Sequence, residues 1–278
     1  MAPAMVIGAV VSVQCGSAAA TTLFDQVGPA GAVLYRLLAA AILLLAIWRP
    51  RPLGAGRDGL LLAGVFGVAL AGMNLCFYES LDRIPLGIAV TFEFVGPLLV
   101  GLFGSRRRLD LVWVGCAAAG VLLLTRPSGS ASAAGIGFAL LAGGFWGAYI
   151  LLSARIGRVF PGGRGLALAM GVAAALMVVP GTAAAGGDLL DPGAAAVGAA
   201  TGVFSSVIPY SLELEALRRI AVGTFGVLMS MEPAVAALIG LIALGQGLAT
   251  IDVLGITLVV VASAGVLGAS VTEAPTEA

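Results

Sequence analysis

Two glutamates lie inside long apolar stretches, where an ionisable side chain is expensive to place. Glu93 is near the middle of "LGIAVTFEFVGPLLVGLFG", and Glu232 lies within "VGTFGVLMSMEPAVAALIGLIALG". Both stretches are long enough to cross a bilayer, so each glutamate predicts a functional site. A carboxyl group in apolar surroundings favours its neutral form, and it could load and release protons or hold a cationic ligand. The alternative is a protonated structural group, and the sequence does not say which glutamate would carry a proton.

Prolines near these glutamates predict broken helices. Pro97 follows Glu93 by four residues, and proline cannot donate a hydrogen bond to the carbonyl group four residues earlier. The carbonyl oxygen of Glu93 should therefore be free, and a free carbonyl at membrane depth needs water, a cation or a ligand ammonium. A kink that serves only packing is the alternative. The same rule should free the carbonyls of two further residues: Met229, through Pro233, and Ser205, through Pro209.

A second set of polar side chains lies in two other apolar stretches and could hydrogen-bond a small polar ligand. Its members are Asn74, Tyr78, Tyr210, Ser211 and Glu213. Two more glutamates lie near helix ends, each four residues before an arginine: Glu79 before Arg83, and Glu215 before Arg219. This spacing favours an ion pair, so both glutamates are interpreted as gate or structural residues.

One arginine stands inside the second apolar stretch. Arg36, next to Tyr35, could clamp a substrate carboxylate with its planar guanidinium group. The alternative is an arginine that reaches up to the outer lipid headgroups. Trp146, Tyr149 and Gln14 could line a cavity, although aromatic side chains at such positions also serve packing.

The composition requires these residues to be held by a membrane-spanning bundle. Of the 278 residues, 60% are hydrophobic and 10% are charged, against about 45–50% and about 25% in soluble domains. The mean hydropathy is +1.11. Apolar runs of bilayer-spanning length predict an all-α fold with ten spans: 4–24, 31–48, 59–80, 86–104, 110–125, 133–154, 165–182, 194–216, 222–244 and 251–270.

The basic residues exclude several kinds of chemistry. All 14 are arginines, and the chain has no lysine and no histidine. A P-loop and a Schiff base need lysine, and zinc sites and proton relays commonly use histidine. Cys15, Cys76 and Cys116 are isolated and lack metal-ligand spacing. We therefore expect no metal, no cofactor and no nucleic acid partner; hydrolysis by two protonatable acids is the one enzymatic alternative.

The arginines also predict an orientation. If the N-terminus is cytoplasmic, eleven arginines fall in inner loops and two, Arg83 and Arg126, in outer loops, which is a strong positive-inside bias. Both termini are then cytoplasmic, and the N-terminal stretch is interpreted as the first span and not as a removed signal. The inner-loop arginines are Arg49, Arg51, Arg57, Arg106, Arg107, Arg108, Arg155, Arg158, Arg164, Arg218 and Arg219.

The two halves of the chain repeat each other. A shift of 136 residues places "ESLDRIPLG" (79–87) on "EALRRIAVG" (215–223), and it also aligns Pro97 with Pro233. Each half, 1–128 and 133–271, then holds five spans, and a short cytoplasmic tail follows at 272–278. An odd number of spans inverts the second half relative to the first. Inverted repeats are typical of secondary transporters, whose site lies near the midplane between the halves.

Two segments carry a family resemblance. "GMNLCFYESLDRIPLGIAVTFEFVGPLLVGLFGSRRRLDLVWV" (72–114) and "PYSLELEALRRIAVGTFGVLMSMEPAVAALIG" (209–240) resemble the bacterial threonine/homoserine exporters of the drug/metabolite transporter superfamily, which are built from two EamA-type domains. The resemblance implies a proton-driven, multi-pass exporter of small amino acids in the bacterial inner membrane, and it leaves a homodimer open. It carries over these site residues: Glu93, Pro97, Tyr210, Glu213, Met229, Glu232 and Pro233.

Two features depart from the pattern of the family. Gly245-Gln246 stands where many relatives have Gly-Glu, which puts a gating role for an acidic group at the outer mouth in doubt. The acidic "TEAPTEA" also replaces a basic tail.

The resulting hypothesis is an alternating-access exporter that binds a zwitterionic amino acid between its halves. We expect the ammonium group near Glu93 or Glu232, and the carboxylate near one of four donors: Asn74, Tyr78, Tyr210 or Arg36. An exporter of drugs or other metabolites on the same scaffold, and a passive channel, are the alternatives.

Overall fold

Apolar runs form helices throughout the part of the chain that the structure describes. This computed structural model describes residues 2–50, 56–103, 110–124, 132–217, 219–220, 225 and 228–272. Within these ranges the chain is helical and contains no strand, in agreement with the all-α prediction. The predicted loop arginines at 51, 106–108, 126 and 218, and the tail after residue 272, lie outside the described residues.

The first half begins with three long helices: α1 (Ala2–Thr21), α2 (Phe24–Trp48) and α3 (Gly56–Leu81). Two short helices follow, α4 (Leu86–Glu93) and α5 (Val95–Phe103), and then α6 (Asp110–Leu124). α2 is kinked at Gly28, whose φ of 68° lies in the left-handed region that glycine adopts without steric cost. Pro29 follows this glycine, so the straight part of α2 begins there.

The second half begins with α7 (Ala133–Val159) and α8 (Arg164–Ala185), followed by a 3-10 turn, η2 (Gly186–Leu190). Three consecutive segments come next: α9 (Pro192–Gly202), the π-helical η3 (Val203–Val207) and α10 (Ile208–Leu217). The last described helices are α12 (Glu232–Leu244) and α13 (Thr250–Thr272). Side-chain caps fix two of the starts, because Ser132 accepts from the N–H of Gly135 and Asp191 from that of Ala194.

Six of these helical stretches are long and apolar enough to cross a membrane, and four shorter apolar stretches lie between or after them. Each coincides with one of the ten ranges that the sequence predicts as spans. Large apolar side chains point outward from the bundle, for example Leu61, Val179 and Ile242, which are 69–75% exposed. Such a surface suits lipid and not water, so the chain is a multi-pass membrane protein.

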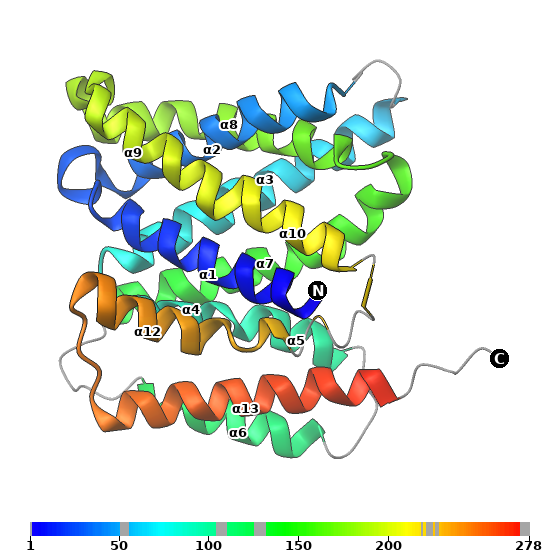
Figure 1. Cartoon of the computed structure of the whole chain (residues 1–278), viewed down its shortest axis with the longest axis vertical. Coiled ribbons are helices and arrows are strands. Elements are labelled where there is room, and N and C mark those ends of the chain that lie inside the picture. Colours follow the sequence, from blue (N-terminus) through cyan, green and yellow to red (C-terminus); the bar gives the residue numbers. More distant parts are fainter. Residues whose placement is uncertain are drawn as a thin grey trace.

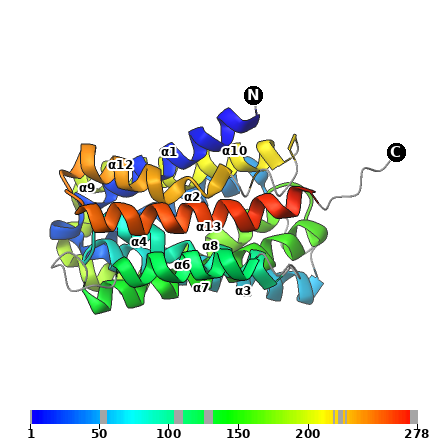
Figure 2. The same cartoon turned by 90° about the horizontal axis from the view of Figure 1, so that it is seen from below.

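The helices run side by side in one layered bundle (Figure 1). α2 packs along α8, α3 along α7, α1 along α10, and α4 along α12. α6 and α13 form a pair at one edge of the bundle, as Figure 1 and Figure 2 both show. Small residues permit close approach: an added Cβ would collide with Ala237 at Gly87, and with Gly255 at Gly120.

The bundle has two distinct ends. α1 begins and α13 ends at the same end (Figure 1), which also holds Trp48 at the end of α2; we call it the terminal end. The opposite end holds the turns between α1 and α2, between α3 and α4, and between α12 and α13.

Each of the three predicted helix-breaking prolines lies in the first turn of a new helical segment. Pro97 is in α5, Pro209 in α10 and Pro233 in α12. The first turn of a helix tolerates proline, since the N–H that it lacks has no partner inside the helix; Pro209 differs, because it follows the π-helical η3 in a continuous helical stretch. The carbonyl oxygen of Glu93 lies against Gly143 of α7, so a helix contact covers this side of the group; its use by a ligand stays a prediction.

Candidate functional site

The predicted charged residues converge at the centre of the bundle. Arg36 comes from α2, Glu93 from the end of α4, and Glu232 from the start of α12. Their exposed fractions are 4%, 8% and 6%. Glu93 interacts electrostatically with both Glu232 and Arg36, so the three side chains form one buried cluster of two acids and one cation.

Arg36 is fixed from three sides. Its Nε donates to the hydroxyl of Ser206 at 3.2 Å, and its Nη1 and Nη2 donate to Tyr78 Oη at 3.3 Å and to the Ser205 carbonyl at 2.9 Å. The guanidinium carbon also lies 5.4 Å from the centre of the Tyr78 ring, a cation–π distance. The alternative of an arginine that reaches the lipid headgroups is therefore wrong.

Glu232 is hydrogen-bonded to Gln14, which the sequence suggests only as a residue that could line a cavity. The amide nitrogen Nε2 of Gln14, on α1, donates to Glu232 Oε1 at 3.0 Å. Gln14 is 2% exposed, so this hydrogen bond is shielded from solvent. The two residues are separated by 218 positions, and no local pattern in the sequence links them.

Aromatic side chains cover one side of the cluster. Tyr149 of α7 stacks on Tyr210 of α10, with ring centres 6.2 Å apart, and Phe66 of α3 continues the row. Tyr210 interacts electrostatically with Arg36 and with both central acids. Trp146 packs edge-on against Phe94, directly after Glu93. The aromatic residues therefore both pack and line the site.

Two of the other predicted site residues, Asn74 and Ser211, donate hydrogen bonds to carbonyl groups four residues earlier in the chain. The amide of the buried Asn74 donates to the Leu70 carbonyl within α3, at 2.8 Å, and Ser211 donates to the Val207 carbonyl. Glu213 of α10 is half-buried and interacts electrostatically with Glu232. Met229 lies half-buried just before α12 and offers no hydrogen-bonding group beyond its weakly accepting sulfur.

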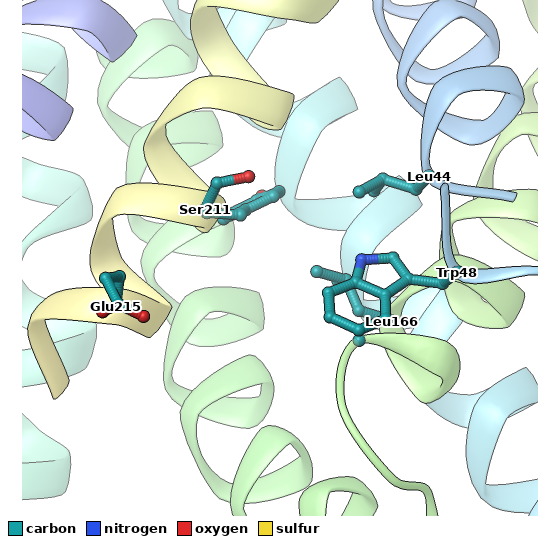
Figure 3. Close-up of a pocket in the computed structure, with 7 residues that line it drawn as sticks. Leu44, Trp48, Leu166, Ser211 and Glu215 are labelled. Atoms are coloured by element: carbon teal, nitrogen blue, oxygen red, sulfur yellow. The ribbon is translucent and has the colours of Figure 1, made fainter. Parts of the chain in front are cut away.

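A pocket lies near the terminal end of the bundle (Figure 3). It has a volume of about 190 Å³, and its walls are Leu44, Trp48, Gly163, Leu166, Tyr210, Ser211 and Glu215. Tyr210 lines this pocket and also interacts electrostatically with the residues of the central cluster. The pocket and the buried charges therefore share one residue.

At the opposite end, side chains join the helices across the same axis. Tyr35 Oη donates to the carbonyl of Leu189 at 2.6 Å. The N–H of Leu86, in the first turn of α4, donates to Gln246 Oε1 at 2.9 Å. The Gln246 side chain therefore caps the start of α4, a helix of the other half. A side-chain amide can serve in this role because its oxygen accepts hydrogen bonds.

Both predicted ion pairs are confirmed. Arg83 contacts Glu79 at 2.7 Å, and Arg219 contacts Glu215. Each pair lies within one helix or its end, and all four side chains are partly exposed. Among the described residues no group of three or more His, Cys, Asp and Glu could hold a metal ion.

Comparison with known proteins identifies the family. The second half, residues 133–268, matches the EamA-like transporter family. The chain is 40% identical to the threonine/homoserine exporter RhtA of Salmonella typhimurium strain LT2 over 257 residues, which cover 91% of this chain and 87% of that protein. It is also 40% identical to RhtA of Escherichia coli K12 over 260 residues, covering 92% and 88%. This chain belongs to the threonine/homoserine exporter branch of the EamA transporters.

Membership of this family makes the chain a transporter and not an enzyme. A solved structure described only as "Crystal structure of protein" has the same fold, with a TM-score of 0.64 and 19% sequence identity. The match covers 98% of this chain and 99% of that one. The chain therefore shares the fold of that structure over nearly its whole length.

Proposed function

We propose that this protein is a proton-coupled exporter of small amino acids, of the threonine and homoserine kind, in the bacterial inner membrane. The observation that carries the proposal is the buried cluster of Arg36, Glu93 and Glu232. A zwitterion brings one positive and one negative group into an apolar medium, and each needs an opposite charge there. The cluster supplies both signs in one place, next to a pocket.

Arg36 is the proposed partner of the substrate carboxylate. Its guanidinium group is held in place by Tyr78 and two serines, and a planar, oriented fork suits a carboxylate better than a lysine ammonium does. Glu93 and Glu232 would take the ammonium group or a proton, and a proton bound there after release would reset the site.

We propose a five-plus-five inverted repeat with ten spans, built from halves at 1–128 and 133–271. The packing pairs support it. Exchanging α1 with α7, α2 with α8, α3 with α10, α4 with α12 and α6 with α13 turns the α3–α7 pair into the α10–α1 pair. The same exchange leaves the α2–α8, α4–α12 and α6–α13 pairs unchanged. A two-fold relation of this kind is what alternating access between inverted repeats uses.

The proposed orientation has both termini in the cytoplasm. The pocket then opens inward, toward the side from which an exporter takes its substrate, and the hydrogen-bonded opposite end faces outward. The arginine bias of the loops supports this orientation, and so does the position of the start of α1 and the end of α13 at one end.

The test is transport into inside-out vesicles with a panel of amino acids and drugs, with and without a lumen that is more acidic than the medium. We expect saturable uptake of threonine and homoserine that the acidic lumen stimulates. Uptake of drugs alone would indicate the alternative exporter, and amino acid uptake that never exceeds equilibrium would indicate a passive channel.

A further inference from the structure

Several buried polar atoms that lack a hydrogen-bond partner belong to α1 and to η3 and α12, which both pack against α1. Among the described residues, seven buried side-chain atoms have no hydrogen-bond partner. Four of them belong to residues of α1, η3 and α12 that meet next to the central cluster: Gln14 Oε1, Ser17 Oγ, Ser205 Oγ and Glu232 Oε2. Buried polar groups are normally paired, so this concentration calls for a missing partner.

Contacts hold these residues together. The Gln14–Glu232 hydrogen bond of 3.0 Å joins α1 to α12. Ser17 lies three residues after Gln14, on the same helical face. Ser205 packs against Gly16 so closely that an added Cβ there would overlap its hydroxyl oxygen. Gln14 and Ser17 therefore share a face of α1 to which Glu232 is bonded, while Ser205 packs against the nearby Gly16.

The orphan atoms define the chemistry of the missing group. Gln14 Oε1 is only an acceptor, and an ionised Glu232 Oε2 is as well, so the group must supply at least two hydrogen-bond donors. It should also be positive, because Glu232 interacts electrostatically with two further acids, Glu93 and Glu213. Arg36 is directed elsewhere, since one N–H of each of its three nitrogens bonds to Tyr78, Ser205 or Ser206.

We propose that Gln14 and Glu232 form the subsite for the ammonium group of the transported amino acid. An ammonium group carries three N–H donors, enough to bond both of these oxygens. This inference rests on the proposed function and deepens it: it selects Glu232 over Glu93 as the ammonium ligand and adds Gln14, a residue that positions the carboxylate and shares its ligand.

Ser205 links this subsite to the proposed carboxylate site. Its hydroxyl faces α1, while its carbonyl accepts from Arg36 Nη2 at 2.9 Å. In an α-amino acid the ammonium and carboxylate groups sit on one carbon atom, so their binding sites must be neighbours. Because Ser205 contacts Arg36 and also Gly16, two positions from Gln14, η3 brings the two sites near each other.

The experiment compares two ligands on the purified full-length protein in nanodiscs. One is threonine, and the other is its analogue with a hydroxyl group in place of the ammonium group. In Gln14→Met, which keeps a side chain of similar length, we expect threonine to bind roughly 10- to 100-fold more weakly, as for loss of a hydrogen bond to a charged group. The affinity for the hydroxy analogue should stay unchanged.

Ser263→Ala is the matched control, because its buried hydroxyl also lacks a partner but lies on α13; it should alter neither affinity. Equal weakening of both ligands in Gln14→Met would mean a structural role and would overturn the inference, as would unchanged threonine binding. If the unmodified protein bound no amino acid, the proposed function itself would fall together with the subsite.

Discussion

At the scale of single residues, Arg36 has the most constrained environment in the described chain. Each of its three nitrogens donates a hydrogen bond, to Tyr78, Ser205 or Ser206. Together these bonds fix the orientation of the planar guanidinium group. A lysine at this position would keep the positive charge but lose the planar arrangement of N–H donors.

We therefore predict that Arg36→Lys lowers the apparent affinity for threonine by roughly 10- to 100-fold, the range for a lost charge-assisted hydrogen bond. Threoninol, which lacks the carboxylate, should bind equally well to both proteins. Competition against radiolabelled threonine in proteoliposomes measures this. Arg57→Lys, on the exposed surface of α3, is the control and should behave as the unmodified protein.

The two central acids give a second prediction. Glu232→Gln and Glu93→Gln each remove a group that can bind a proton, so at least one should abolish the stimulation of threonine uptake by an acidic lumen in inside-out vesicles. Glu79→Gln, a change at a half-buried side chain that breaks the ion pair with Arg83 at the end of α3, should keep the stimulation. Wild-type rates in both central variants would refute the assignment of proton coupling to this cluster.

At the scale of elements, the contact between the α4–α5 break and α7 depends on glycine. Gly143 packs on the Glu93 carbonyl, and Gly96 packs on the backbone of Gly143. The glutamate is therefore positioned by a backbone contact between helices as well as by its own helix.

We predict that Gly143→Ala lowers the free energy of unfolding by about 1–3 kcal/mol, as overpacking does, and shifts Glu93. Denaturation of the detergent-solubilised protein, followed by tryptophan fluorescence, measures the change. Gly144→Ala is the matched control, since an added Cβ there meets nothing within 4 Å. Equal loss of stability in both variants would contradict the packing argument.

The sequence predicts the helices better than the hydrogen bonds that join one helix to another. Hydropathy locates the helices and prolines locate their breaks, because both signals are local. The bonds from Arg36 to η3 and from Gln14 to α12 join residues 169 to 218 positions apart, so no spacing rule reveals them. The π-helical turn of η3, which brings Ser205 and Ser206 to Arg36, also leaves no periodic signature. The lone Gln14 in an apolar span was the only available hint.

At the scale of the whole molecule, the proposed antiparallel halves predict opposite sides for two loops. In a variant without native cysteines, Ser105→Cys, after the fourth span, should react with an impermeant thiol reagent only when the cytoplasmic side is accessible. Gly247→Cys, after the ninth span, should react from outside. Labelling of intact cells and of inside-out vesicles provides the measurement, and reaction of both positions from one side would disprove the inverted repeat.

At the end opposite the termini, two hydrogen bonds join uncharged groups: Tyr35 with the Leu189 carbonyl, and the Leu86 N–H with the Gln246 amide. The Glu79–Arg83 ion pair lies at the same end, where α3 ends. Mobile ions screen interactions between charges but act little on contacts between neutral groups. In the proposed orientation, a change in the ionic strength outside the cell should therefore alter the strength of the ion pair and leave the two neutral hydrogen bonds nearly unchanged.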